Sequence, residues 1–358
     1  MYRSIVFPIL SRIDAEAAHG LSLKTVRVLT RVPGAAQTLR ATLSVKDTRL
    51  QRELFGLPFD NPIGLAAGFD KLGSTANNLS CLGFGHVEVG TVTPLPQAGR
   101  PKPRMFRLTQ DQALINRIGF ASNGCQAMRR TLSSHRRGGF VLGVNIGPNA
   151  ENTDVNRAVL DYVTCYEALH EAADYFTINI SSPNTQGLRL LHGKAQLQQL
   201  LSSFFSAIQN PAGLKPVLLK VSPDLTEHDL NDLVDVALDH PIAGLIATNT
   251  TLDRPTGLRS AHRQESGGLS GRPLAPLATQ TIRTLFRLTG GRLPIIGVGG
   301  VFTAADVVEK MQAGASLVQV YTGLVYSGPL MVRRLNLGVL NHLQLQGLKS
   351  LEQLVGTS

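Results

Sequence analysis

Apolar runs of strand length alternate with helical stretches along most of this chain, and this alternation constrains the fold more than any other feature. The expected strands cover residues 62–67, 86–93, 140–146, 175–181, 216–221, 243–248, 294–298 and 316–321. The expected helices between and after them cover residues 153–173, 194–209, 226–239, 274–289, 303–313 and 328–345. Eight strand–helix units in 358 residues predict an α/β protein built as a (β/α)8 barrel, the TIM barrel.

Small polar residues stand where these strands end. The strand at 175–181 runs into Ser182, Pro183 and Asn184, and the rigid proline stops the strand there. The other strand ends carry polar groups or glycines in the same position, among them Gly68, Asp70, Thr91, Asn145, Lys220, Thr248 and Gly300. Barrel enzymes keep their chemistry at the carboxyl ends of the strands, so the sequence predicts an active site at this end.

Residues 1–40 are expected to form a helical extension that precedes a barrel domain at 41–358. A first helix is predicted over 4–13, where Ser4 can serve as N-cap and Pro8 falls in the first turn. Asp14 is a suitable N-cap for a second helix to about residue 31. The extension is apolar and basic, which favours contact with a membrane surface. The alternative is a helical hairpin that only packs on the barrel.

Two segments do not fit the barrel repeat. Residues 48–60 are expected to form a small hairpin that caps the barrel bottom. Residues 95–118 are rich in proline and arginine and are expected to form an insertion.

Composition narrows the function. The formal net charge of +10 suits an anionic substrate, a phosphate-bearing cofactor or an anionic membrane surface. Nucleic acid is disfavoured, because the basic residues are scattered and aromatic residues make up only 5% of the chain. The three cysteines show neither a metal-ligand spacing nor a disulfide framework, so no metal is expected. No apolar run approaches the ~20 residues of a membrane span, and no secretory signal is evident, so we expect the protein on the cytosolic side.

Glycine-rich turns follow the seventh and eighth strands. They read Gly297-Val298-Gly299-Gly300 and Tyr321-Thr322-Gly323, and Gly271 can add a further N–H group. Glycine lets backbone N–H groups approach phosphate oxygens closely, and in barrels these two loops often bind phosphate. The alternative is that the turns are tight only for packing.

Lys220 stands in an apolar strand, so its ammonium is expected to face the barrel mouth and a negative partner. It could stabilise an anionic cofactor such as a reduced flavin, or form a Schiff base. Groups suited to the edges of a planar heterocycle are Thr91, Asn145, Asn179 and Thr248, and groups suited to a small anionic substrate are Lys71, Asn116, Asn184, Asn249 and Thr250. No histidine is placed as a base for Ser182, so a hydrolytic triad is not indicated.

Six motifs resemble those of the dihydroorotate dehydrogenase family, and the resemblance covers essentially the whole chain. They are Ala-Ala-Gly-Phe-Asp-Lys (66–71), Ile-Asn-Arg-Ile-Gly-Phe (115–120), Asn-Ile-Ser-Ser-Pro-Asn (179–184), Ala-Thr-Asn-Thr-Thr (247–251), Gly-Gly-Leu-Ser-Gly-Arg-Pro-Leu (267–274) and Ile-Ile-Gly-Val-Gly-Gly (295–300). Within the family, the chain resembles the class 2, quinone-dependent, membrane-associated enzymes of bacterial type. Ser182 stands where class 1 enzymes carry a catalytic cysteine, and the helical extension has an Asp-x-x-x-Ala-His pattern at 14–19.

The resemblance implies two ligands at the strand ends. One non-covalent FMN would be held by Ala67, Gly68, Phe69, Asp70, Lys71, Thr91, Asn145, Asn179, Lys220, Thr248, Gly271, Gly300, Tyr321 and Thr322. Dihydroorotate would be held by Lys71, Asn116, Arg117, Ile118, Gly119, Phe120, Asn179, Asn184, Asn249 and Thr250.

The resemblance also implies the reaction, which belongs to de novo pyrimidine biosynthesis. Ser182 would take the C5 proton of dihydroorotate while a hydride passes from C6 to the flavin, and the electrons would then reach a membrane quinone. His19 and Arg107 stand at positions associated with the quinone path. A serine hydroxyl is a poor base, so we expect a relay through Thr185 or a water, with Phe120 shielding the site. The alternative is that Ser182 only hydrogen-bonds substrate or backbone.

Pro8 and Phe69 depart from the family pattern. These two departures affect the expected detail of the quinone path and matter little to the chemistry. The resemblance further implies a bacterial-type chain without a targeting leader, bound peripherally to the cytoplasmic face of the cell inner membrane through its N-terminal helices. A monomer is compatible with the sequence, which does not fix the oligomeric state. Three alternative functions remain for a chain of this pattern: a soluble class 1-like flavoenzyme using fumarate or a nicotinamide, a Schiff-base aldolase built on Lys220, and a non-enzymatic phosphoribosyl-binding barrel.

Overall fold

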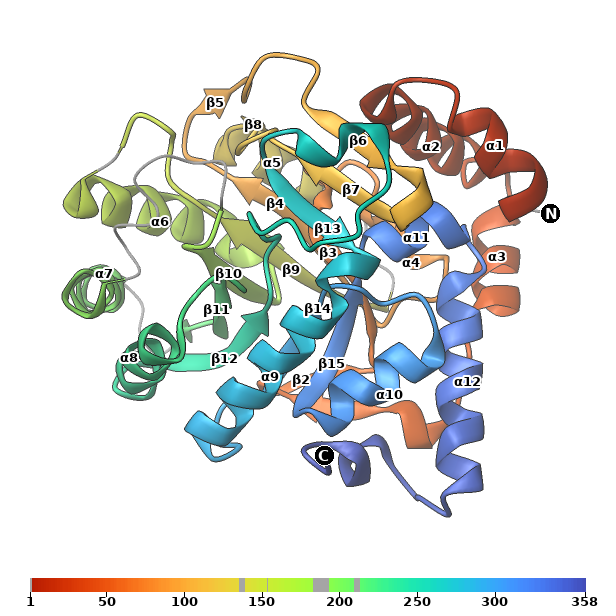
Figure 1. The fold of residues 1–358 in the computed structure, drawn as a ribbon. Helices are drawn as coiled ribbons and strands as arrows, with labels where there is room; N and C mark the ends of the chain where they lie inside the picture. The colour runs from red at the N-terminus through yellow and green to blue at the C-terminus, as the bar shows by residue number, and fades with distance from the viewer. Residues whose placement is uncertain (1, 135–138, 153, 183–192, 209–212) are drawn as a thin grey trace.

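A closed barrel of parallel strands forms the centre of the molecule (Figure 1). The computed structural model describes residues 2–134, 139–152, 154–182, 193–208 and 213–358. Within this part of the chain, eight strands pair in the closed order β10-β11-β12-β14-β15-β3-β4-β9. Their bounds are β3 Ile63–Asp70, β4 His86–Val92, β9 Val141–Ile146, β10 Tyr175–Asn179, β11 Val217–Val221, β12 Ile242–Ala247, β14 Ile295–Val298 and β15 Ala315–Val320. The predicted (β/α)8 barrel is confirmed, and the predicted strands differ from these only at their ends.

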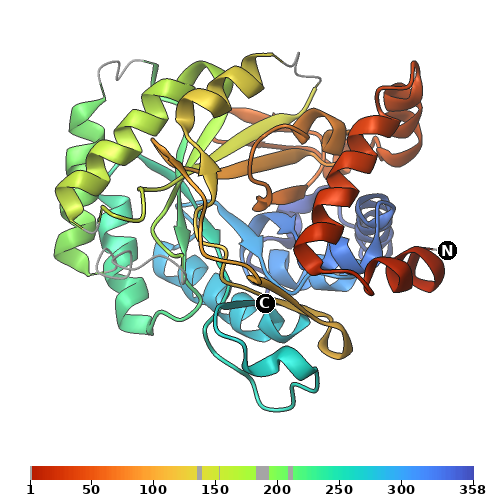
Figure 2. The same cartoon turned by 90° about the horizontal axis from the view of Figure 1, so that it is seen from above.

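Helices surround the barrel and cover the outer faces of its strands (Figure 2). They are α4 Ala76–Ser80, α5 Cys125–Ser133, α6 Val155–Leu169, α7 Lys194–Ala207, α8 Glu227–Leu238, α9 Ala275–Thr289, α10 Ala304–Gln312, α11 Thr322–Ser327 and α12 Met331–Leu345. Helices α8 and α10 each begin with a capping box, made by Thr226 with Asp229 and by Thr303 with Asp306. Because helices cover the sheet, its strands are buried on both faces and read as continuous apolar runs.

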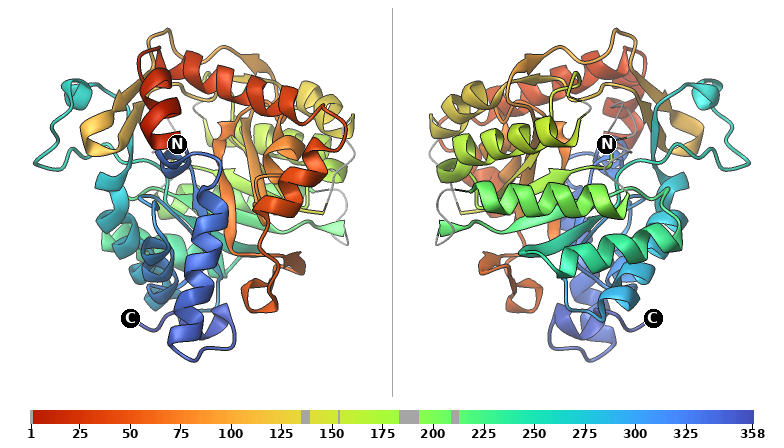
Figure 3. Two further views of the ribbon diagram at one scale, coloured as in Figure 1. Left: turned by 90° about the vertical axis from the view of Figure 1, so that its right-hand side faces the viewer. Right: turned by 90° about the vertical axis from the view of Figure 1, so that its left-hand side faces the viewer.

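A short hairpin closes the end of the barrel where the strands begin. It consists of β1 Arg52–Leu54 and β2 Leu57–Phe59, inside the range predicted for a capping hairpin. Phe59 is buried there, with its ring centroid 5.4 Å from that of His86 at the start of β4. Figure 3 shows this hairpin at the opposite end of the molecule from the N-terminal helices. The hairpin therefore covers this end of the barrel, and the predicted site residues are expected at the other end.

An antiparallel sheet stands over the carboxyl ends of the strands. It consists of β6 Met105–Leu108, β7 Ala113–Asn116 and β13 Gly268–Gly271, in the order β13-β7-β6. A smaller pair, β5 Pro96–Gln97 and β8 Ser122–Asn123, lies beside it. In the register, Gly268 pairs with Asn116 and Gly271 with Ala113. The predicted insertion at 95–118 thus pairs with a segment about 150 residues further on and brings Asn116 and Gly271 to one place.

The N-terminal helices differ in detail from the prediction. A π-helical turn, η1 Tyr2–Val6, leads into α1 Phe7–Leu10, so the single helix over 4–13 capped by Ser4 was wrong. Pro8 lies in the first turn of α1, where its missing N–H costs no helical hydrogen bond. The Asp14 cap is confirmed, since its carboxylate accepts a hydrogen bond from the Ala17 amide at 2.9 Å.

After Asp14, helix α2 spans Ala15–Leu29 and a further helix, α3 Ala35–Leu43, follows Gly34. The sequence analysis did not predict α3, and residue 40 lies inside it. Helix α2 is attached to the sheet over the barrel by an ion pair between Glu16 and Arg104 at 2.8 Å. None of the helices in the described ranges combines the length and the apolar character that crossing a bilayer requires.

Candidate active site

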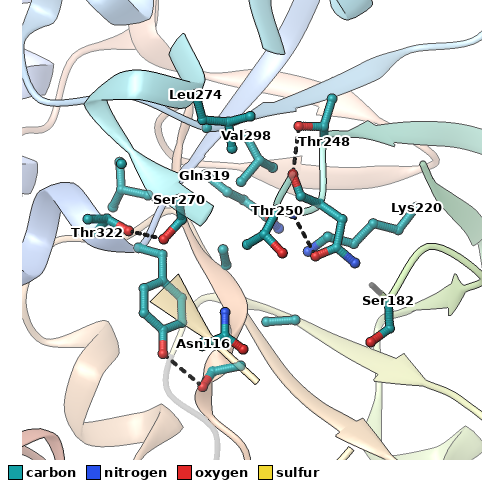
Figure 4. A pocket seen from close by; sticks show the side chains of 18 of the residues that line it. Asn116, Ser182, Lys220, Thr248, Thr250, Ser270, Leu274, Val298, Gln319 and Thr322 are labelled. Carbon is teal, nitrogen blue, oxygen red and sulfur yellow. Dashed lines mark hydrogen bonds between the residues drawn. The ribbon is translucent and has the colours of Figure 1, made fainter. Parts of the chain in front are cut away.

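The strand ends and the sheet above them enclose a cavity, named here the strand-end cavity. Most of the predicted ligand-binding residues line it: Ala67, Gly68, Lys71, Thr91, Asn116, Ile118, Gly119, Phe120, Asn179, Ser182, Lys220, Thr248, Asn249, Thr250, Gly271, Gly300, Tyr321 and Thr322. Figure 4 shows Lys220 on one side of the cavity and the hydrogen-bonded hydroxyls of Ser270 and Thr322 on the other. Residues spread from 67 to 322 therefore meet at the barrel end that the sequence predicted.

Two lysines give the strand-end cavity a positive character. Lys220, near the end of β11, is only 5% exposed, and Lys71 follows the end of β3. Burial lowers the pKa of Lys71 to about 8, with a further lowering from the positive charge of Arg104. Burial also lowers the pKa of Lys220, and the negative charge of Glu88 opposes this shift. Neither ammonium has an ion pair with a carboxylate in the described part of the chain, so both are available to an anionic ligand.

Side-chain amides from neighbouring strands form a connected chain at the cavity. The Thr91 hydroxyl donates a hydrogen bond to Asn145 Oδ1 at 2.6 Å, and Asn179 Nδ2 donates to the same oxygen at 3.1 Å. Asn249 Nδ2 donates to Asn179 Oδ1 at 3.4 Å. Thr91, Asn179 and Asn249 line the cavity, whereas Asn145 is fully buried behind them. These hydrogen bonds fix which donor and acceptor atoms of the side chains face the cavity.

Glycines form the part of the cavity wall that was predicted to hold a phosphate. Gly300 has φ +75°, and a Cβ there would lie 2.4 Å from the Ala275 Cα. Gly271 has φ +100°, and a Cβ there would lie 2.4 Å from the Gln112 carbonyl oxygen. Only glycine fits these two positions without strain, and both glycines line the cavity with their backbone. A phosphate group can approach such a surface closely.

Some predicted residues have their side chains elsewhere. Arg117 Nη1 lies 2.6 Å from a carboxylate oxygen of Glu265, and its guanidinium lies 4.4 Å from the Phe106 ring centroid. The Asp70 carboxylate accepts a hydrogen bond from the Thr75 amide at 2.7 Å, and burial raises its pKa to about 6. These side chains are occupied by structural contacts, so only the backbone of Arg117 and Asp70 is left for a ligand.

Ser182 lies at the edge of the strand-end cavity and is 6% exposed. It also borders a second, adjoining hollow lined by Ser222 and Asp224. Asp224 was not singled out in the sequence, and it is a carboxylate that the fold brings to the same hollow as Ser182. The Asp224 carboxylate accepts hydrogen bonds from the Thr251 hydroxyl and from the Leu252 amide. The predicted ligand Asn184 and the predicted relay residue Thr185 lie outside the described residues.

A second large cavity, named here the helical cavity, lies between helices α1 to α3 and the barrel. Its volume is about 500 Å³. Apolar side chains such as Leu10, Val26 and Leu43 line most of it, and the two residues predicted for the quinone path, His19 and Arg107, line it as well.

Tyr321 and Phe69 separate the two cavities. Tyr321 lines both, and Phe69 lines the helical cavity with its ring centroid 5.3 Å from that of Tyr321. His19 Nε2 lies 2.7 Å from the Phe69 carbonyl oxygen, to which it can donate a hydrogen bond, and burial lowers the pKa of His19. The wall between the cavities is therefore a pair of aromatic rings, with Phe69 held by a residue of α2.

Two buried polar residues near the cavity escaped the sequence analysis. Gln319 lines the strand-end cavity, and Glu88 lies fully buried in β4. The sequence held a signal for Glu88, since this carboxylate stands between two valines in a strand that is buried throughout. A charge at such a position needs a partner or a use.

Comparisons with known proteins agree with this geometry. The family model described as dihydroorotate dehydrogenase matches residues 49–343. A protein of Christiangramia forsetii named dihydroorotate dehydrogenase (quinone) is 46% identical over 340 residues, which cover 95% of this chain and 99% of that protein. The mitochondrial dihydroorotate dehydrogenase (quinone) of Mus musculus is 47% identical over 345 residues, which cover 93% of this chain and 84% of that protein. The crystal structure of DHODH in complex with ferulenol from Eimeria tenella superposes with a TM-score of 0.85 at 37% identity, covering 96% of this chain and 95% of that one.

The chain thus belongs to the dihydroorotate dehydrogenase family, a family of barrel oxidoreductases. The relatives compared above are named as quinone-dependent members of that family, and bacterial ones are among them, as the sequence motifs predicted. The prediction that the protein is an enzyme is confirmed at the level of the family.

Proposed function

We propose that the protein oxidises dihydroorotate to orotate, with FMN as hydride acceptor and a membrane quinone as final electron acceptor, in pyrimidine biosynthesis. The observation that carries the proposal is the pairing of two unlike cavities at one aromatic wall. The strand-end cavity is polar and cationic, whereas the helical cavity is apolar, and Tyr321 lines both. An anionic substrate and a lipid-soluble acceptor need two such environments within electron-transfer reach of one cofactor.

The residues of the strand-end cavity fit FMN. The backbone at Gly271 and Gly300 suits its phosphate, and Thr91, Asn179 and Thr248 offer hydrogen bonds to the edges of its ring. Bound there, FMN supplies a site that accepts a hydride and releases electrons one step later. Lys220 contributes a buried positive charge that stabilises negative charge gained by a ring ligand.

Dihydroorotate fits the remaining part of the same cavity. Lys71 can pair with its carboxylate, and Asn116 and Asn249 can bind its amide edges. Ser182 acts as the base: it takes the C5 proton and passes its own hydroxyl proton through the relay of Thr185 or a water, and the negative charge of Asp224 in the adjoining hollow favours this transfer. Phe120, only 5% exposed, keeps water from this part of the site.

The quinone enters through the helical cavity and the N-terminal helices contact the membrane peripherally, at the cytoplasmic face of the inner membrane. Large apolar side chains on these helices are exposed, including Ile5 at 54%, Ile9 at 62% and Val28 at 60%. Basic side chains accompany them, such as Lys24 and Arg31. Exposed apolar groups beside cations are suited to an anionic lipid surface.

Anaerobic spectroscopy of the purified protein tests the proposal. We expect a yellow protein whose flavin absorbance is bleached by dihydroorotate and restored by a quinone. Excess FMN should also stabilise the fold, by ~2.7 kcal/mol at 100 times its dissociation constant. A protein that binds no FMN, or that is not bleached by dihydroorotate, contradicts the proposal.

A further inference from the structure

Glu88 is a carboxylate within the closed interior of the barrel. It is fully buried and accepts three hydrogen bonds, from Asn145 Nδ2 at 2.9 Å, from the Tyr175 hydroxyl at 3.0 Å and from Gln319 Nε2 at 2.9 Å. Barrel interiors are usually filled by branched apolar side chains, and a buried charge is costly unless it is hydrogen-bonded. A carboxylate with three donors around it at this depth points to a function beyond packing.

Because Glu88 can only accept hydrogen bonds, it determines how the neighbouring side-chain amides are oriented. A carboxylate has no hydrogen to donate, so Asn145 must turn its Nδ2 toward Glu88. Asn145 Oδ1 then faces the cavity side, where it accepts from Thr91 and from Asn179 Nδ2. Asn179 Oδ1 is in turn left to accept from Asn249 Nδ2. The side-chain amides of Asn249, Asn179 and Asn145 therefore all donate in the direction of Glu88.

We propose that Glu88 is a positioning residue whose carboxylate fixes the direction of the amide chain Asn249–Asn179–Asn145, and thereby sets which atoms face the bound rings. The inference rests on the proposed function, in which Asn179 contacts the FMN ring and Asn249 contacts dihydroorotate. A heterocycle has donors and acceptors at fixed positions, so a reversed amide would oppose like groups. The charge of Glu88 has a second effect in the same direction, because it opposes the lowering of the Lys220 pKa by burial.

Glu88→Gln tests the role of the carboxylate with almost no change in shape. The substituted amide has both a donor and an acceptor, so it accommodates either orientation of the chain and no longer imposes one. The measurement is the dissociation constant of orotate for the FMN-loaded enzyme, from the orotate-induced change in flavin absorbance. We expect binding to weaken on the order of tenfold relative to the wild type. Thermal melting of the same samples reports whether the fold is kept.

A charge swap supplies a rescue that a structural role does not predict. In the double variant Glu88→Gln/Asn145→Asp, the new amide at position 88 can donate to the new carboxylate at position 145. That carboxylate still accepts from Thr91 and Asn179, so the direction of the chain is restored. We expect orotate binding to return to within about threefold of the wild type. Asn145→Asp alone places its new carboxylate against that of Glu88. This variant should bind orotate more weakly than Glu88→Gln and more weakly than the double variant.

Tyr175→Phe is the matched control, because it removes one hydrogen bond to Glu88 and leaves the carboxylate and Asn145 in place. Its orotate affinity should stay within about threefold of the wild type. The inference is overturned if Glu88→Gln binds orotate like the wild type, if Tyr175→Phe loses as much affinity, or if a folded double variant shows no recovery. Where the double variant does not fold, the contrast between Glu88→Gln and Tyr175→Phe decides. A wild-type protein without an orotate response overturns the proposed function itself, and this inference with it.

Discussion

The two cavities that meet at Tyr321 are built in opposite ways. At the strand-end cavity, Asn179 in the wall and Asn145 behind it come from adjacent strands and are fixed by hydrogen bonds with a definite direction. In the helical cavity, side chains such as Val26 and Leu43 come from separate helices and are held by apolar packing without direction. The first construction suits a ligand whose every polar atom must be matched. The second suits apolar molecules of varied shape, and polar residues of its lining, such as His19 and Arg107, are the groups that can make directed contacts there.

The largest effect is expected from removing the base in the strand-end cavity, which should leave the helical cavity unaffected. Ser182→Ala should slow flavin reduction by dihydroorotate ~10²–10⁴-fold, because positioned bases contribute that much. Orotate affinity should stay within a few-fold. Ser182→Cys should recover part of the rate and move its pH profile downward, since a thiol has a pKa of ~8.5. Anaerobic stopped-flow reduction measures both, and a wild-type rate in the alanine variant would exclude Ser182 as the base.

Lys220→Ala should act on the same cavity through charge. A buried cation stabilises negative charge that appears in the reaction, so its loss should slow flavin reduction on the order of 10²-fold. Quinone-dependent reoxidation of chemically reduced enzyme provides the internal comparison, because the helical cavity is unaltered. Reduction at an unchanged rate would remove Lys220 from the mechanism.

Val26→Asp tests the helical cavity, since it places a charge in the apolar lining of that cavity. A charge that must be desolvated there should weaken the reaction with quinone by about tenfold. Reduction by dihydroorotate should be unchanged. Lys24→Asp, on an exposed position of the same helix that does not line the cavity, is the control when a short-chain quinone is used in detergent. Equal losses in the two variants would mean that helix charge, not the cavity, limits the quinone step.

The smallest effect concerns pH. The pKa of Lys71 is lowered to about 8, so its ammonium is charged below that pH and is lost as the pH rises through it. Affinity for orotate should therefore be constant up to about pH 7 and fall about twofold at pH 8, where half of the lysine is neutral. Lys71→Arg should flatten this profile, because arginine stays protonated. If the affinity of the wild-type protein for orotate does not change between pH 7 and pH 9, the Lys71 ammonium does not pair with the carboxylate of the ligand.

The strand-end cavity could be predicted largely from sequence because its parts are local patterns. A strand that ends in Asn179 or Lys220 shows its period and its polar terminus within a few residues, and the barrel topology then brings such ends together. What escaped prediction depends on contacts between distant residues. The pairing of Gly268 with Asn116 joins segments about 150 residues apart and leaves no periodic signal in either.

The helical cavity was less predictable for a related reason. Its helices were expected from composition, but the π-helical turn before Pro8 and the helix after Gly34 were not. Apolar composition specifies that a surface is buried and not which volume is left open between helices. Glu88 escaped for a third reason, since its meaning depends on the partners that three other strands bring to it.

The aromatic wall of Tyr321 and Phe69 has one more consequence. It is about one side chain thick, with ring centroids 5.3 Å apart, and it closes off two openings that lead to different surroundings. Electrons can cross such a partition, whereas neither a pyrimidine nor a lipid can. Under the proposed function the two reactants never compete for the same space, and each can arrive or depart while the other remains in place. Under the same proposal, electrons pass from a water-soluble reactant to a lipid-soluble one while the two molecules stay in separate cavities.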